Sequence, residues 1–329
     1  MLLSGHPIVP LFHQTSVLLV HDDSSVLAKT QQLLRGQFEC LGFSGAVEAL
    51  AFIRSGSASP PPAGKAETEL EYIQDPTERR LHSTLTGFPK LFADGSRFGR
   101  ASVVVAASDL PGPAGLDFLE ALRGTPIAKL ILLPADPNVP TLRALEIGLA
   151  DAACPSEALA SQLARCQLAY FQRLAEPYAP MLASSDARFL HDPAFAQVFS
   201  AFRRDYGIIE HCVLMQPPGI LGLDASGNPA ILLIADDDYR QASFEIALVE
   251  QAPPELLRRL LPGTHLASFP TASGFYSPEM GECWDDYVWP GTPFGSDRRR
   301  WAVIDMPDVL GQVCGPIASY ADHRRGWLN

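Results

Sequence analysis

An apolar run that leads into a Pro-Gly turn and then into helical spacing most constrains how this chain folds. The stretch is ASVVVAASDLPGPAGLDFL, residues 101–119. It predicts a strand at Val103–Ala107 and a helix at Leu116–Leu122. A strand that is apolar on both faces is typical of a parallel sheet covered by helices on both sides.

The same alternation of strand and helix repeats before and after this stretch. Further strands are predicted at Ser16–Val20, Phe38–Phe43, Leu130–Leu133 and Asp151–Ala153. Further helices are predicted at 26–34, Ala46–Ile53 and Leu142–Ile147, and from Ser156 onward. Five strand–helix units favour an α/β domain with a five-stranded parallel sheet.

The last of these helices carries an apolar seam, made by Leu159, Leu163, Cys166 and Tyr170. Steps of four and three residues place these side chains on one side of the helix. The seam can pack on the sheet or on another helix, and the second possibility would make it part of a dimer interface.

A segment rich in Gly, Ser and Pro, SGSASPPPAGKA at 55–66, interrupts the α/β pattern. We expect an insertion over about 55–99 that acts as a surface flap or a partner contact. A hinge near Glu176–Pro180 then predicts two domains, 1–178 and 179–329, a usual division for 329 residues.

The second half reads as an α+β output or sensor domain with an antiparallel sheet. Its expected strands are Ile208–Met215, Ile220–Leu223, Ile231–Ile234 and Trp301–Ile304, and its expected helices start near Asp192, Asp236 and Pro254. Adjacent strand residues point to opposite faces. We therefore expect Cys212 in the core and His211 at the surface.

The net charge and the cysteines of the chain indicate which kinds of partner and which cellular compartment are expected. A net charge of −12 argues against nucleic-acid binding, which needs clustered Lys and Arg. Six scattered cysteines without a CxxC pair favour reduced thiols. The N-terminal segment is not typical of a secretion signal, and no run reaches membrane-spanning length. The prediction is a cytoplasmic protein that does not bind a membrane.

The Pro-Gly turn carries a family resemblance. Pro111, Gly112, Gly115 and Leu116 match the P-G-x-x-G-L loop of a response-regulator receiver domain, a flavodoxin-like fold. The resemblance covers residues 15–175 apart from the insertion. It implies a phosphorylated aspartate four residues before the proline, but Ala107 occupies that position. A methyl group cannot attack a phosphoryl donor.

The resemblance also implies further pocket groups: two acidic residues that hold Mg²⁺, a hydroxyl after the fourth strand and a lysine after the fifth. The first acidic position is matched by His21 and the second by Asp22, with Asp23 as an extra neighbour. Such a set would hold Mg²⁺ weakly at most. Otherwise His21 and Asp22 form a polar strand end bonded to nearby backbone.

The hydroxyl and lysine positions are replaced as well. Pro134 stands where the hydroxyl is implied. Cys154, Pro155 or Ser156 stands at the lysine position, and the chain has no lysine after Lys129. Four of the five implied positions have therefore lost their charge or hydrogen-bonding ability. The sequence predicts a degenerate receiver, or pseudo-receiver.

An aromatic and acidic stretch, CWDDYVW, is the most distinctive feature of the second half. It contains Trp284, Asp285, Asp286, Tyr287 and Trp289. These side chains could line a small-molecule pocket or an interface, or they could belong to ordinary strand packing.

We predict a response-regulator-like signal transduction protein that binds a protein partner or dimerises without phosphorylation. It would need no cofactor and would not be an enzyme. One alternative keeps conventional two-component phosphorelay from a histidine kinase, with Asp109 as the acceptor and Asp22 and Asp23 holding Mg²⁺. Another gives the second domain an enzymatic or small-molecule sensing role, although no catalytic set is visible there.

Overall fold

The computed structural model describes residues 8–55, 92–107, 114–133, 139–176, 185–215, 218–269, 283–295 and 298–327. These residues form two compact units. The first contains 8–9, 14–55 and 96–176, and the second contains Pro10–His13, 92–95 and the residues from 185 onward. The predicted boundary at 178 and 179 lies outside the described residues and stays a prediction.

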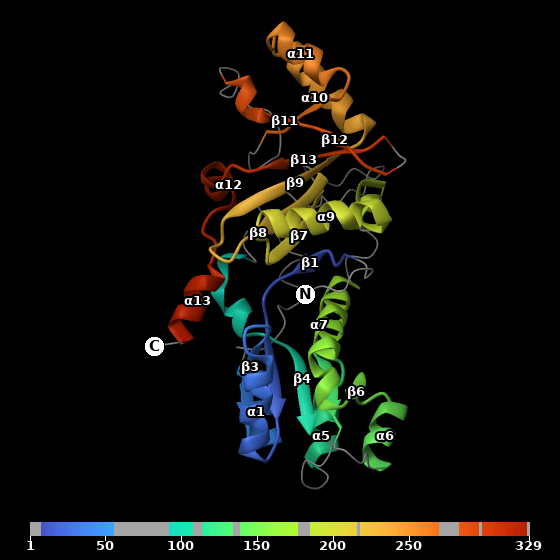
Figure 1. The fold of residues 1–329 in the computed structure, drawn as a ribbon, viewed down its shortest axis with the longest axis vertical. Coiled ribbons are helices and arrows are strands. Elements are labelled where there is room, and N and C mark those ends of the chain that lie inside the picture. The colour runs from blue at the N-terminus through green and yellow to red at the C-terminus, as the bar shows by residue number, and fades with distance from the viewer. Residues whose placement is uncertain are drawn as a thin grey trace, which may run out of the picture. The chain divides into compact units, whose positions relative to one another are not determined.

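The first unit contains a parallel sheet with the strand order β3-β2-β4-β5-β6 (Figure 1). The strands are β2 (Ser16–Val20), β3 (Glu39–Phe43), β4 (Ala101–Ala107), β5 (Ala128–Leu132) and β6 (Ala152–Cys154). All of the residues of β2 and β4 are buried, as their continuous apolar runs predict. The predicted five-stranded receiver sheet is confirmed.

Helices cover both faces of this sheet. They are α1 (Ser24–Leu34), α2 (Ala46–Arg54), α5 (Ala114–Ala121), α6 (Val139–Glu146) and α7 (Leu159–Ala175), with a 3₁₀ turn, η2, at Ser156–Ala158. Leu34 of α1 and Leu159 and Leu163 of α7 share a buried cluster with Val17 and Val103. All four seam residues of α7 are buried inside this chain. The seam is therefore occupied by the core and is not open to a second copy.

The second unit is built on a six-stranded antiparallel sheet with the order β1-β7-β8-β9-β13-β12. Its strands are β1 (Leu11–Phe12), β7 (Glu210–Met215), β8 (Pro218–Leu223), β9 (Pro229–Ala235), β12 (Thr292–Pro293) and β13 (Arg300–Ile304). The loop between β8 and β9 is closed by Asp224, whose carboxylate accepts the N–H groups of Ser226 and Asn228 at 2.8 Å each. The predicted antiparallel sheet and its hairpin are confirmed.

Helices and a small two-stranded sheet surround these strands. The helices are α9 (Pro193–Asp205), α10 (Asp237–Val249), α11 (Pro254–Leu260), α12 (Pro307–Cys314) and α13 (Tyr320–Trp327), with 3₁₀ turns at Ser185–His191 (η4) and Trp284–Tyr287 (η6). A further 3₁₀ turn, η1 (Gly95–Gly99), belongs to the first unit from Ser96 onward. The small sheet pairs β10 (His265–Ala267) with β11 (Val288–Pro290). Asp192 and Asp236 cap α9 and α10 by accepting the N–H groups of Ala194 and Tyr239.

One helix packs closely on the large sheet through aromatic side chains. Figure 1 shows α9 lying across β7 and β8. A Cβ on Gly222 of β8 would stand 2.9 Å from a ring carbon of Phe202 on α9 and 2.8 Å from Ile208. Glycine is therefore required there, because any larger side chain would push the helix away from the sheet.

The expected surface position of His211 is wrong. Its side chain is 1% exposed and is stacked with Phe12 at 5.8 Å, and the ring of Phe199 meets it edge-on at 4.8 Å. Alternation does place His211 and Cys212 on opposite faces, but α9 covers the face that was expected to meet water. Cys212 is buried, as predicted.

No helix in the described parts of the chain is both long enough and apolar enough to span a membrane.

A carboxylate joins α7 to the amino-terminal side of the parallel sheet. Asp151 accepts the backbone N–H of Lys129 at 2.7 Å and forms an ion pair with Arg173 of α7. Arg173 also donates to the carbonyl oxygen of Pro126 at 3.3 Å. The two side chains are 26% and 32% exposed, so water screens much of their attraction.

We predict that Asp151→Ala lowers the free energy of unfolding of the first unit by about 1–3 kcal/mol, because it strands the Lys129 N–H. Arg173→Ala should lower it by about 1 kcal/mol or less. Urea unfolding monitored by hydrogen exchange of β5 and α7 measures both. Asp205→Ala, which removes the exposed Arg204–Asp205 ion pair, is the control. Equal losses for Asp151→Ala and Asp205→Ala would contradict the prediction.

Candidate functional site

The carboxyl ends of the parallel strands gather the residues that the receiver resemblance singles out. Val20 pairs with Ala106, so His21 follows β2 at the level of Ala107. Ala107 in turn pairs with Leu132, and Leu132 pairs with Cys154. His21, Ala107 and Cys154 therefore end three strands at the same edge of the sheet. Cys154 is the last residue of β6, which favours it over Pro155 or Ser156 as the match to the lysine.

The three polar residues after β2 are bonded to each other and to α1. Asp23 is the N-cap of α1 and accepts the Ser25 N–H at 2.7 Å. The Asp23 N–H donates to His21 Nδ1 at 2.9 Å, so the neutral imidazole carries its proton on Nε2. Asp22 Oδ1 lies 3.2 Å from the same Nδ1, and its side chain is 52% exposed. One carboxylate is thus engaged as a helix cap and the other faces water.

Ala107 and Cys154, at the ends of β4 and β6, cannot take the roles that a receiver gives to its acceptor aspartate and its lysine. Ala107 has no group that could form an acyl phosphate, and Cys154 is buried. Burial raises the pKa of the Cys154 thiol, so the side chain is neutral at physiological pH. A neutral thiol cannot supply the positive charge that a lysine provides beside a phosphoryl group. Of the described residues at this edge of the sheet, Ala107 cannot act as the nucleophile and Cys154 cannot act as the cation.

The remaining predicted pocket residues, Asp109 and Pro134, lie outside the described residues. Among those that are described, no group of three or more His, Cys, Asp and Glu side chains is placed to hold a metal ion. Asp22 and Asp23 remain only candidates for a weak Mg²⁺ site.

The aromatic and acidic stretch of the second unit divides between the core and a surface cavity. Trp284 starts η6, is 5% exposed and meets the ring of Phe269 edge-on at 5.8 Å. Tyr287 packs against the same cluster, and Trp289 packs against the core of the large sheet. Strand β11 begins only at Val288. Ordinary strand packing therefore accounts for Trp289 but not for Trp284, Asp285 and Asp286, which lie in η6.

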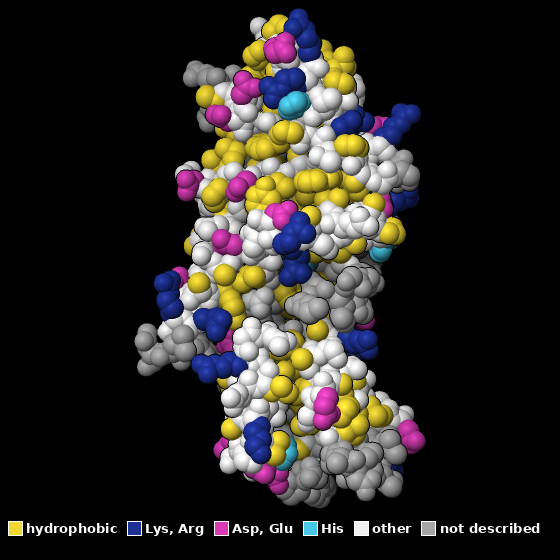
Figure 2. Space-filling model, viewed as in Figure 1, with side chains coloured by type: hydrophobic (Ala, Val, Ile, Leu, Met, Phe, Trp, Pro, Cys, Tyr) yellow, Lys and Arg dark blue, Asp and Glu magenta, His cyan; other side chains and the backbone are white. Residues whose placement is uncertain are grey.

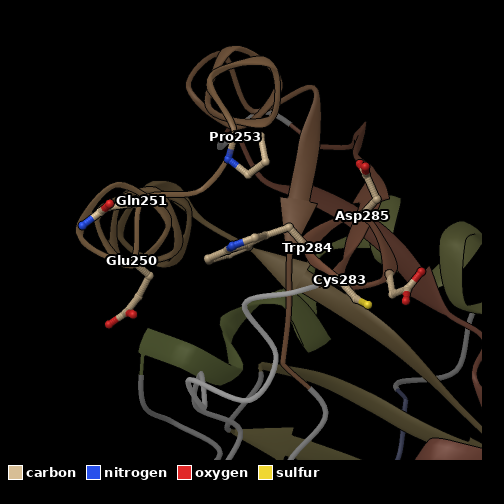
Figure 3. A pocket seen from close by; sticks show the side chains of 7 residues that line it. Glu250, Gln251, Pro253, Cys283, Trp284 and Asp285 are labelled. Carbon is tan, nitrogen blue, oxygen red and sulfur yellow. The ribbon is translucent and has the colours of Figure 1, made fainter.

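The cavity has a volume of about 350 Å³ and takes Trp284, Asp285 and Asp286 from this stretch. The sequence did not indicate its other lining residues, Glu250, Gln251, Pro253 and Cys283. Figure 3 shows the indole of Trp284 pointing toward Pro253 and the end of α10, whereas Asp285 points away from Glu250. Asp285 is also paired with Arg259 at 3.0 Å. The carboxylates of Asp285 and Glu250 therefore diverge, and the described residues around them include no group of three His, Cys, Asp or Glu side chains placed to hold a metal ion.

Comparison with solved structures identifies one protein that is similar over nearly the whole chain. The response regulator LqsR of Legionella pneumophila matches with a TM-score of 0.70 and 21% sequence identity, covering 97% of this chain and 95% of LqsR. The chain therefore has the fold of a response regulator, and the resemblance found in its sequence is confirmed at the level of the fold.

Receiver domains match about half of the chain. Those of a putative Luxo repressor protein from Vibrio parahaemolyticus and of a CheY-like protein from Methanospirillum hungatei are 14% and 17% identical and cover 50% and 49% of it. They cover 98% and 99% of their own lengths, with TM-scores of 0.33 and 0.31. Because both scores lie below 0.5, the fold assignment depends on LqsR. No protein-family model and no curated protein sequence matches the chain.

We predict that Ser25→Ala raises the pKa of the Asp23 carboxyl toward its ordinary value of 3.8. The Ser25 side chain and its backbone N–H both hydrogen-bond the carboxylate and lower this pKa. The cap therefore stabilises α1 fully above pH 3.8, and that stabilisation is lost as the pH falls through the lowered value. Carboxyl-carbon NMR titration measures the shift. Ser24→Ala is the control, and an unchanged Asp23 pKa in Ser25→Ala would contradict the prediction.

Proposed function

We propose that this chain is a response-regulator-like signal transduction protein whose first unit acts by binding a protein, without accepting a phosphoryl group. The observation that carries the proposal is the row of strand ends, where Ala107 and the neutral thiol of Cys154 stand at the implied acceptor and lysine positions. The two-unit fold shared with LqsR supports the signalling role. The second unit would be the output or sensor domain.

The electrostatics of a phosphorylated state argue in the same direction. Phosphorylation of an aspartate replaces one negative charge by about two at pH 7, and a receiver balances them with Mg²⁺ and a lysine. Here Asp22 and Asp23 follow β2 at the same edge of the sheet, and Cys154 at the implied lysine position is uncharged. A new phosphoryl group would therefore lack the positive charge that a lysine supplies, and binding of a protein is the better candidate signal.

The partner is proposed to be a protein: another polypeptide or a second copy of the chain. Figure 2 shows Lys and Arg side chains scattered among acidic and uncharged ones on the visible face of the described residues. With a net charge of −12, this distribution favours proteins over nucleic acids. Because the α7 seam is buried, a dimer would use other surfaces. Residence in the cytoplasm remains a prediction from the sequence.

We predict that incubation of the full chain with acetyl phosphate and Mg²⁺ gives no phosphoryl adduct by intact-mass spectrometry. Beryllofluoride with Mg²⁺ should likewise leave hydrogen exchange of β2, β4 and α7 unchanged, because no acceptor carboxylate completes the site. A phosphorylatable receiver domain treated in parallel is the positive control.

The alternative acceptor is tested in the same experiment. If an adduct of one phosphoryl group appears and is lost in Asp109→Asn, the chain is a phosphorylatable regulator and the proposal is wrong. Asp117→Asn, which changes an exposed carboxylate of α5, is the matched control variant.

A further inference from the structure

The two units are joined by a very short connection between two strands. Strand β1 belongs to the second unit and β2 to the first, and only His13, Gln14 and Thr15 separate them. A fully extended chain of this length spans roughly 14 Å from Phe12 to Ser16. A displacement of either end that exceeds this length must move the other end.

At its first end, this connection is held by the edge of the antiparallel sheet. Leu11 pairs with Cys212, Phe12 pairs with His211, and the Val213 N–H donates to the carbonyl oxygen of Pro10 at 2.7 Å. A strand of two residues has few hydrogen bonds to lose. Local opening of so short a ladder at the edge of the sheet would give β1 a docked and an undocked state.

At its other end, the connection is held by a buried hydroxyl. Thr15 Oγ1 donates to Ser102 Oγ of β4 at 2.7 Å and accepts a hydrogen bond from Gln167 Nε2 of α7 at 3.2 Å. Thr15 and Ser102 are 4% and 0% exposed. One side chain thus joins the start of β2 to a neighbouring strand and to a helix that covers the sheet.

The strand that holds Ser102 also follows closely on residues of the second unit. Phe92 lies in the core of the large antiparallel sheet, and its carbonyl oxygen accepts the Ala318 N–H at 2.9 Å. Strand β4 begins nine positions later, at Ala101. The hydrogen bond between Thr15 and Ser102 therefore ties together the starts of two adjacent strands, each of which is connected by a short segment to the second unit.

We propose that the Thr15–Ser102–Gln167 hydrogen-bond network couples the position of α7 to the docking of β1 on β7. A partner that shifts α7 would strain or break the Gln167–Thr15 bond, and the short connection would pass the displacement to β1. The edge of the second unit's sheet would then open or close in response. This coupling needs no phosphoryl group, and its test does not depend on whether the first unit can be phosphorylated.

The Val213 amide reports on the coupling, because its N–H is bonded to Pro10. Hydrogen exchange of the full chain, resolved by NMR, is measured for wild type, Gln167→Ala and Thr15→Val. In both variants the Val213 amide should exchange about fivefold to tenfold faster, the size expected for losing one neutral hydrogen bond. The amides that join β8 to β9 should keep their wild-type rates and serve as the internal reference.

Two further variants separate coupling from general loosening. Gln172→Ala changes an exposed glutamine on the same helix and should leave the Val213 rate unchanged. The Thr15→Val/Gln167→Ala double variant should exchange no faster than Thr15→Val alone, because both changes act through one hydroxyl. An unchanged Val213 rate in Gln167→Ala, or an equal increase in Gln172→Ala, would overturn the proposal.

Discussion

The short link from β1 to β2 is the constraint on which the rest of the structure depends. Through this link, β1 at the edge of the antiparallel sheet is followed after three residues by β2, a central strand of the parallel sheet. Strand β2 lies between β3 and β4 and is fully buried, so it cannot slide without breaking the parallel ladder on both sides. The parallel ladder and the bond between Thr15 and Ser102 therefore hold the start of β2 within the first unit.

The proposed absence of phosphoryl chemistry is compatible with the stability of the same sheet. The cores of β2 and β4 depend on apolar packing with α1 and α7, to which the strand-end residues contribute little. Ala107 and Cys154 stand where the resemblance implies a carboxylate and a lysine, and neither of them carries a charge whose burial would require a partner. Asp23 retains a structural use as the cap of α1, so it would be favoured even where no metal binds.

The sequence pattern predicted the large elements of the parallel sheet most directly at β2 and β4, which are apolar runs that are buried throughout. It could not predict β1, since Leu11 and Phe12 form a strand only by pairing with β7, about 200 positions later in the chain. At His211, the alternation of side chains along β7 predicted which residues share a face of the sheet. It could not predict which face is exposed to water, because α9 covers the face that carries His211. The cavity beside Trp284 combines the end of α10 with a segment about 30 positions away, and no local pattern connects them. Strand ends were predictable, and contacts between distant segments were not.

Signalling without phosphate must draw its free energy from differential binding. A partner can shift an equilibrium only by as much as its affinity differs between the two states. The first unit must therefore present two arrangements that a partner distinguishes, and the second unit must respond to the same change. The docked and undocked states of β1 satisfy both conditions if α7 moves with the Gln167–Thr15 bond. In this proposal a hydroxyl beside a three-residue connection takes the place of a charged switch, because a hydrogen bond, rather than an added anion, carries the signal.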